Sequence, residues 1–155
     1  MKIQIPEYIQ VLIDLLNQNH YNAYVVGGAI RNALLGLPIH DYDLTTDATP
    51  DEMLQVFSSY RLFKTGIQHG TITVLSDGQS VEITTFRSEN TYEDHRHPST
   101  VSFSSNIEED CKRRDFTINA LCYNNSEGLI DFFGGIEDLQ HKIIRCIGNA
   151  NERID

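Results

Sequence analysis

The feature that most constrains the fold of this chain is a pair of glycines, Gly27 and Gly28, set between two apolar segments. Residues 23–26 form a short β-rich run, and residues 29–35 have the composition of a short helix that ends at Gly36. Glycine tolerates the backbone conformations of a tight turn and places no Cβ in the way of a ligand. The pattern therefore predicts a strand, a turn and a helix in direct succession.

A turn of this kind can bind phosphate, because the N–H groups at a helix N-terminus point toward incoming anions. Arg31 would add a positive charge one turn into the helix. The alternative is a tight connection without a ligand, since the Gly-Lys-Ser/Thr ending of a P-loop is missing.

Two aspartates, Asp41 and Asp43, follow the predicted helix and flank Tyr42. In an extended segment, side chains two residues apart share one face. Two carboxylates at such a short distance repel each other unless a cation lies between them. Mg²⁺ binds one or two carboxylates and completes its shell with water and substrate phosphates. The pair therefore suggests a Mg²⁺ site, and an exposed acidic turn is the alternative.

Glu82 lies in a β-rich run, residues 80–86, in which Val81 and Ile83 face one side and Glu82 the other. A sheet with helices on one face would leave Glu82 on the open face beside the two aspartates. Three carboxylates there suit a two-metal site. A solvated strand position is the alternative for Glu82.

Residues 113–120 form the other unusual stretch, in which Arg113 and Arg114 precede Asp115, and Asn119 follows one turn later. These side chains could present donors and acceptors to a ribose and a triphosphate. In the alternative interpretation, Asp115 only caps a helix and the arginines are solvated.

The remaining patterns predict short mixed elements without internal repeats. In chain order these are a helix with the apolar stripe Ile9, Leu12, Ile13 and Leu16, a helix starting at the Thr49 capping box, a hairpin of residues 71–75 and 80–86, an irregular loop over 87–104, a helix starting at Ser105, a helix over 118–121 capped by Asp115, strands around 122–123 and 129–130, and a helix ending near Leu139.

Length and charge add broader limits. The 155 residues suffice for one domain, and no apolar run approaches the roughly 18 residues of a membrane span, so a cytoplasmic protein without a membrane partner is expected. Three cysteines with no paired spacing indicate reduced thiols. The net charge of −10 argues against a nucleic-acid partner, because phosphate backbones favour Lys and Arg.

Taken in order, however, the motifs resemble the head domain of bacterial class II tRNA nucleotidyltransferases, the CCA-adding enzymes, and of related poly(A) polymerases. The matching blocks are residues 27–31, 41–50, 66–71 and 81–87, the loop residues Tyr92, Asp94, Arg96 and Pro98, and residues 113–120, 131–135 and 138–139. The resemblance covers the chain from about Tyr24 onward.

The resemblance implies an α+β nucleotidyltransferase fold of the polymerase-β palm type, with a mixed, mostly antiparallel sheet and helices on one face. It implies two Mg²⁺ ions, CTP and ATP as donors and the 3′ end of tRNA as acceptor. By this resemblance Asp41 and Asp43 bind the metals, and Glu82, from its expected place on the open sheet face, is the third expected catalytic residue. The implied nucleotide-binding residues are Gly27, Gly28, Arg31, Arg113, Asp115 and Asn119.

The resemblance also sets the expected domains, a catalytic head over residues 1–141 and the start of a truncated neck over 142–155. Asn32 and His97 depart from the family pattern, which has aspartate and commonly arginine there. The resemblance implies that base selection and most tRNA binding lie in later domains. The net charge of −10 would then describe only the head domain and not the surface that binds tRNA. Poly(A) polymerase or partial CCA addition is the alternative activity, and a non-catalytic nucleotide- or RNA-binding module is a further one.

Overall fold

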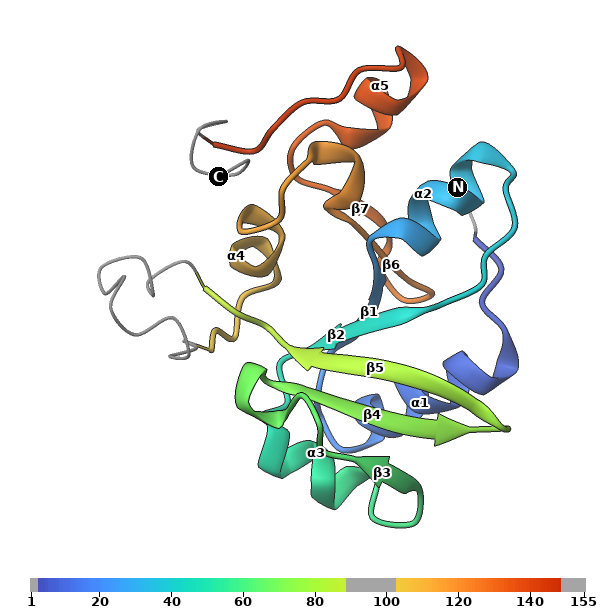
Figure 1. The fold of residues 1–155 in the computed structure, drawn as a ribbon, viewed down its shortest axis with the longest axis vertical. Coiled ribbons are helices and arrows are strands. Elements are labelled where there is room, and N and C mark those ends of the chain that lie inside the picture. The colour runs from blue at the N-terminus through green and yellow to red at the C-terminus, as the bar shows by residue number, and fades with distance from the viewer. Residues whose placement is uncertain (1–2, 89–102, 149–155) are drawn as a thin grey trace.

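The structure is a computed structural model that describes residues 3–88 and 103–148, and its centre is one seven-stranded sheet (Figure 1). The strands are β1 Ala23–Val26, β2 Asp43–Thr46, β3 Arg61–Phe63, β4 Thr71–Ser76, β5 Gln79–Thr85, β6 Leu121–Asn124 and β7 Gly128–Asp131. The helices are α1 Glu7–Gln18, α2 Gly28–Leu35, α3 Pro50–Val56, α4 Ile107–Lys112 and α5 Gly135–Gln140, with 3₁₀ turns η1 Ile67–His69 and η3 Thr117–Asn119.

The strand order is β3-β4-β5-β2-β1-β6-β7, and the pairing is mostly antiparallel. The pair β2–β5 is parallel, and it joins segments far apart in the chain. The remaining neighbours pair antiparallel, among them the predicted hairpin β4–β5. The predicted fold class, an α+β fold with a mixed and mostly antiparallel sheet, is thereby confirmed.

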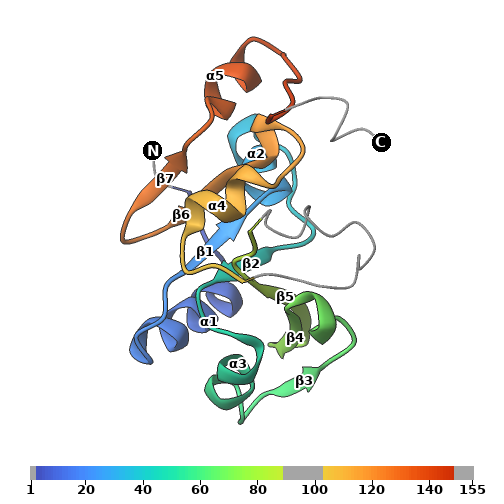
Figure 2. The same ribbon diagram turned by 90° about the vertical axis from the view of Figure 1, so that its left-hand side faces the viewer.

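Helices α1 and α3 lie together against one face of the sheet, as Figure 2 shows. The predicted stripe of α1 is buried there, beside Met53 and Phe57 from the α3 segment. Thr49 begins α3 with the predicted capping box, in which its hydroxyl accepts from the N–H of Glu52 and the Glu52 carboxylate accepts from the N–H of Thr49.

Helix α4 packs on the other face, over the β1–β6 end of the sheet. Strand β1 alternates: Ala23 and Val25 belong to the α1 side, whereas Tyr24 and Val26 pack with Cys111 of α4. The helical layer expected on one face is therefore present, and α4 adds a partial second layer. Within the described residues, no helix is long and apolar enough to cross a membrane.

Two local predictions for the second half were wrong. Helix α4 is capped by Asn106, whose side chain accepts from the N–H of Glu108 at 2.8 Å, so the helix starts later than the Ser105 pattern predicts. Asp115 does not begin an α-helix; the chain makes only the 3₁₀ turn η3 before it enters β6. Pairing of β6 with both β1 and β7 takes up the residues from Leu121 that a longer helix would need.

Candidate active site

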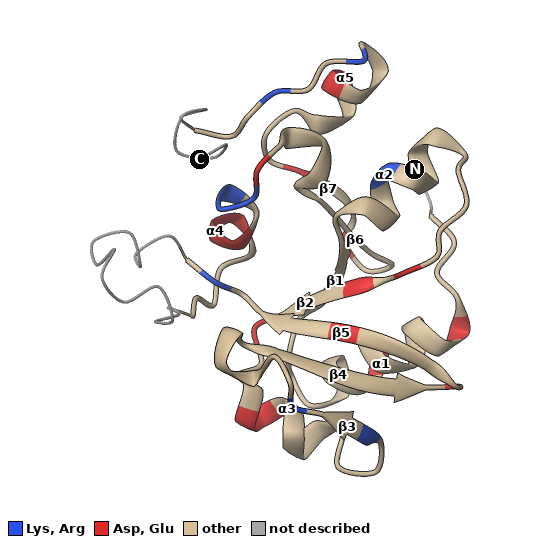
Figure 3. Cartoon of the chain, viewed as in Figure 1, with Lys and Arg blue, Asp and Glu red and all other residues tan. Residues whose placement is uncertain are grey.

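The carboxylates lie where β2 and β5 run side by side. Asp43 is the first residue of β2 and stands opposite Glu82 of β5 in the parallel register. Figure 3 shows acidic residues adjacent on these two strands. Asp41 precedes the strand by two residues, and all three side chains border one depression of about 350 Å³. That depression is lined by Asp41, Tyr42, Asp43, Thr73, Ser80 and Glu82.

Strand pairing explains why these residues meet. Val81 and Ile83 are buried against the helical layer, which turns the exposed Glu82 to the opposite face. Leu44 is buried in the same way and leaves Asp43 exposed beside Glu82. The structure therefore brings together the three carboxylates that the sequence suggested.

Burial and the neighbouring carboxylates both act on the pKa of Asp43. Partial burial raises this pKa above its ordinary value, and the negative charges of Glu82 and Asp41 raise it further. The positive charge of Arg114 acts in the opposite direction. The site therefore favours a bound cation, which would offset the negative charge.

The donor set fits Mg²⁺ only with help from a substrate. In the described part of the chain, no three His, Cys, Asp or Glu side chains group closely enough to hold a metal ion. Mg²⁺ commonly binds through one or two carboxylates and completes its shell with water and substrate phosphates. Asp41 and Asp43, both exposed on one side of the sheet, provide such a partial set.

The glycine turn lies next to this face, because β1 is the neighbour of β2. Gly27 has φ 73° and ψ −136°, a conformation that only glycine adopts without strain, and Gly28 begins α2. A Cβ on Gly28 would lie 3.3 Å from Nη2 of Arg31, so the arginine folds back over the turn. This guanidinium and the start of α2 thus share one site.

Two of the predicted nucleotide-binding residues form a chain of hydrogen bonds that starts at Arg31. Nη1 of Arg31 donates to Oδ1 of Asn119 at 2.7 Å. Nδ2 of Asn119 donates to Oδ1 of Asp115 at 3.3 Å. In the described structure, Asn119 therefore holds Arg31 in place, whatever further contact it makes with a ligand.

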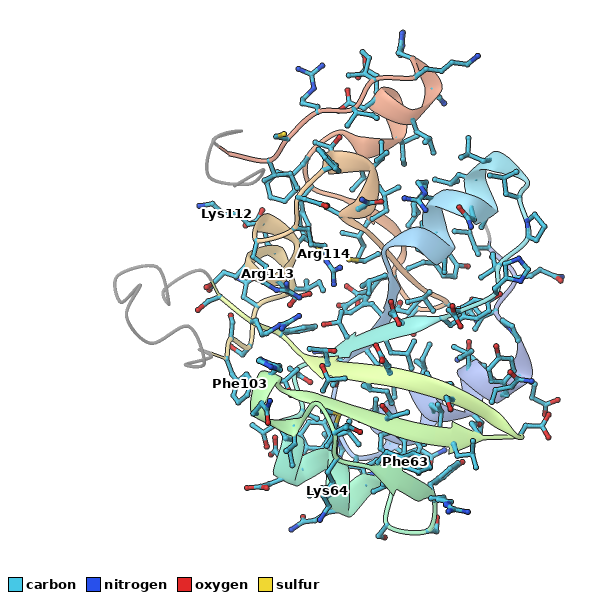
Figure 4. All side chains as sticks on the ribbon, in the orientation of Figure 1. Phe63, Lys64, Phe103, Lys112, Arg113 and Arg114 are labelled. Atoms are coloured by element: carbon cyan, nitrogen blue, oxygen red, sulfur yellow. The ribbon has the colours of Figure 1, made fainter. Side chains whose placement is uncertain are left out.

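Arg113 and Arg114 come from the end of α4 and face the middle of the molecule, whereas Lys112 points away (Figure 4). Arg114 approaches the glycine turn, since a Cβ on Gly27 would lie 3.9 Å from its Nη1. Every predicted nucleotide-binding residue thus lies on the segments that surround the glycine turn.

Sequence reasoning missed Asp110. Its carboxylate is fully buried and accepts hydrogen bonds from Nε of Arg113 at 3.1 Å and from Nη2 of Arg114 at 3.2 Å. An aspartate three and four residues before two arginines is a helical ion-pair spacing, so the signal was present in the sequence. It did not stand out, because α4 carries further acidic residues that are exposed.

A mixed sheet that presents paired carboxylates beside a glycine turn and an arginine cluster defines a nucleotidyltransferase type of fold. The sequence matches the Poly A polymerase head domain family over residues 23–145, and the chain belongs to this family.

Known relatives extend this assignment. The chain is 48% identical over 142 residues to the CCA-adding enzyme of Ligilactobacillus salivarius, which covers 92% of this chain and 35% of that protein. The CCA-adding enzyme of Bacillus stearothermophilus in complex with CTP superposes with a TM-score of 0.83 at 38% identity, over 96% of this chain and 36% of the other. The Thermotoga maritima CCA-adding enzyme complexed with tRNA-CCA gives a TM-score of 0.72 at 26% identity, over 96% and 37% of the two chains.

This chain therefore spans about a third of the length of the relatives that it matches. These similarities establish the family of the chain. The roles of individual residues and the domain boundary near residue 141 remain predictions.

Proposed function

We propose that this chain is the catalytic head of a CCA-adding enzyme, which transfers CMP and AMP from CTP and ATP to the 3′-hydroxyl of tRNA. The placement of Asp43 opposite Glu82, with Asp41 on the same depression, carries the proposal. The relatives named above support the substrates, since one is a complex with CTP and another a complex with tRNA-CCA.

Asp41 and Asp43 would hold two Mg²⁺ ions together with the triphosphate. When bound, Mg²⁺ lowers the pKa of the attacking hydroxyl and neutralises charge on the leaving pyrophosphate. Glu82 would add negative charge beside Asp43 and strengthen the preference of this face for cations. The pKa of Asp43, raised by burial and by the neighbouring Glu82 and Asp41, matches that arrangement.

The remaining residues would bind the nucleotide. N–H groups at the start of α2, next to Gly27 and Gly28, would donate to phosphate oxygens, and Arg31 would add charge over the same turn. Arg113 would add a guanidinium from the end of α4. Asp115 and Asn119, already linked to each other, would contact the ribose hydroxyls.

The reaction is an in-line displacement at the α-phosphate. The 3′-hydroxyl oxygen bonds to the α-phosphorus, the bond to the bridging oxygen of pyrophosphate breaks, and the hydroxyl proton leaves to solvent or a nearby base. Charge builds on the phosphate oxygens in the transition state, so positioned N–H donors and arginines supply most of the protein's own contribution.

The test is incorporation of labelled nucleotides by the full-length protein of the gene with Mg²⁺ present. A tRNA that lacks its CCA end should gain CMP and AMP, and an otherwise identical protein carrying Asp41→Asn should add neither. Long AMP tails on any RNA would instead show a poly(A) polymerase. No incorporation into any RNA would refute the enzymatic role.

A further inference from the structure

One carboxylate in the described structure is fully buried and is not a predicted ligand of metal or nucleotide, that of Asp110 in α4. Its Oδ1 accepts from the backbone N–H of Arg87 at 2.9 Å and from Nε of Arg113 at 3.1 Å. Its Oδ2 accepts from Nη2 of Arg114 at 3.2 Å and from the hydroxyl of Thr45 at 3.2 Å, whose single proton is shared with the carbonyl oxygen of Thr84 at 3.1 Å. Four donors thus occupy the roughly four lone-pair positions of an ionised carboxylate.

These donors come from three separate parts of the fold. Thr45 belongs to β2, two residues after Asp43, and Arg87 follows the end of β5. Arg113 and Arg114 follow α4. Asp110 therefore ties the two strands that carry Asp43 and Glu82 to the segment that carries the arginines.

The cluster contains more positive than negative charge. Arg87, Arg113 and Arg114 surround Asp110, and the pKa of Arg87 is lowered to about 10 by burial and by the neighbouring arginines. Nε atoms of Arg87 and Arg114 are buried and have no hydrogen-bond partner in the described structure. Without Asp110 these cations would repel each other and turn outward to water.

The geometry of Arg114 shows what this arrangement achieves. One end of its guanidinium is fixed by Asp110, and the other end, Nη1, lies beside Gly27. Val26, the residue before Gly27, pairs with Asp43 in the sheet, so the glycine turn that Arg114 approaches adjoins the carboxylates. An arginine clamped at one end loses little further freedom when its other end meets an anion.

We propose that Asp110 is a positioning residue for nucleotidyl transfer: it holds Arg113 and Arg114 together and aims Arg114 at the place where the triphosphate would lie, between the glycine turn and the carboxylates. The inference rests on the proposed function and deepens it, because it concerns recognition of the triphosphate. Asp110 itself touches neither substrate nor metal.

Asp110→Asn separates positioning from simple charge. The amide keeps the size of the carboxylate but removes one negative charge, and it turns two acceptor positions into donors that oppose the arginines. If only net charge mattered, a more positive cluster would bind the triphosphate more tightly. If Asp110 aims the arginines, CTP binding weakens despite the added positive charge.

The measurement is the dissociation constant of CTP and of CMP, by calorimetry with Mg²⁺, on the full-length protein of the gene. The wild-type protein should prefer CTP over CMP. In the Asp110→Asn variant we expect that preference to fall by about tenfold or more, which corresponds to roughly 1.4 kcal/mol. A purely structural role would leave the ratio of the two constants unchanged.

Two further variants keep the test decisive. Leu12→Ala opens a cavity in the α1 core, away from the arginines, and controls for lost stability. Its CTP to CMP ratio should equal that of the wild type. Should Asp110→Asn fail to fold, Thr45→Val removes one donor while it keeps a similar shape, and a smaller fall in the same ratio is expected.

The outcomes distinguish the two proposals. An unchanged or increased preference for CTP in the folded Asp110→Asn variant, or in Thr45→Val where that replaces it, would overturn the positioning role alone. Absence of CTP binding by the wild-type protein would overturn the proposed function, and the positioning role with it.

Discussion

Replacing Gly27 with alanine isolates the contribution of the turn between β1 and α2. Gly27 has φ 73° and ψ −136°, so an alanine there is strained even though its Cβ would meet nothing closer than Nη1 of Arg114 at 3.9 Å. Strain of this kind costs about 1–3 kcal/mol. For a chain of this size each kcal/mol lowers Tm by about 2–4 °C, so a decrease of about 2–12 °C is expected.

The loss of nucleotide binding should exceed what strain alone explains. The backbone can relieve the strain by rotating the peptide, which would turn N–H groups at the start of α2 away from a phosphate. Losing one hydrogen bond to a charged group costs about 1.5–3 kcal/mol. We therefore expect CTP affinity, measured by calorimetry with Mg²⁺, to fall by about 10- to 100-fold.

Gly78 offers a matched control. It has φ 74°, lies in the turn between β4 and β5, and has nothing within 4 Å of an added Cβ. Gly78→Ala should therefore lower Tm as well but leave CTP binding unchanged. If Gly27→Ala lowered Tm as expected and still bound CTP like the wild type, the glycine turn would not be a phosphate site.

Two other predictions concern charge and stability. The raised pKa of Asp43 means that the folded chain binds more protons than the unfolded chain between about pH 4, the ordinary value, and the raised pKa. Urea unfolding without metal should show the wild type losing stability relative to Asp43→Asn as pH rises through this window; a difference that does not depend on pH would refute the raised pKa. Thr49→Ala removes the α3 capping box and should cost about 0.5–2 kcal/mol in the same assay. CTP affinity should not change, and a loss of binding would show that α3 contributes to the site.

The local elements were largely predictable because their signals are local. The stripe of α1 and the Thr49 capping box each lie within a few residues, and both appear in the structure. The β4–β5 hairpin follows from an Asp77-Gly78 turn whose two residues both have positive φ. At the start of α4, spacing alone pointed to Ser105, whereas Asn106 is the residue whose side chain caps the helix.

The site was predictable only in part. Asp41 and Asp43 are two residues apart in sequence, and the shared side expected for an extended segment agrees with the depression that both border. The hydrogen bond from Arg31 to Asn119 joins residues 88 positions apart, and no local pattern specifies it. The spacing of Asp110 to Arg113 and Arg114 was visible in the sequence, but only the packing of α4 over β2 and β5 buries this aspartate among its donors.

The sequence by itself determined which chemical groups the chain carries and which short elements hold them, because turns, caps and alternation are set by neighbouring residues. Only the tertiary structure decided that Glu82 stands opposite Asp43, because the parallel pairing of β2 with β5 is a long-range choice made by burial on the helical face. The same packing places the arginines of α4 beside the glycine turn. A net charge of −10 is a sum over the whole chain and says nothing about such a local cluster of positive charge.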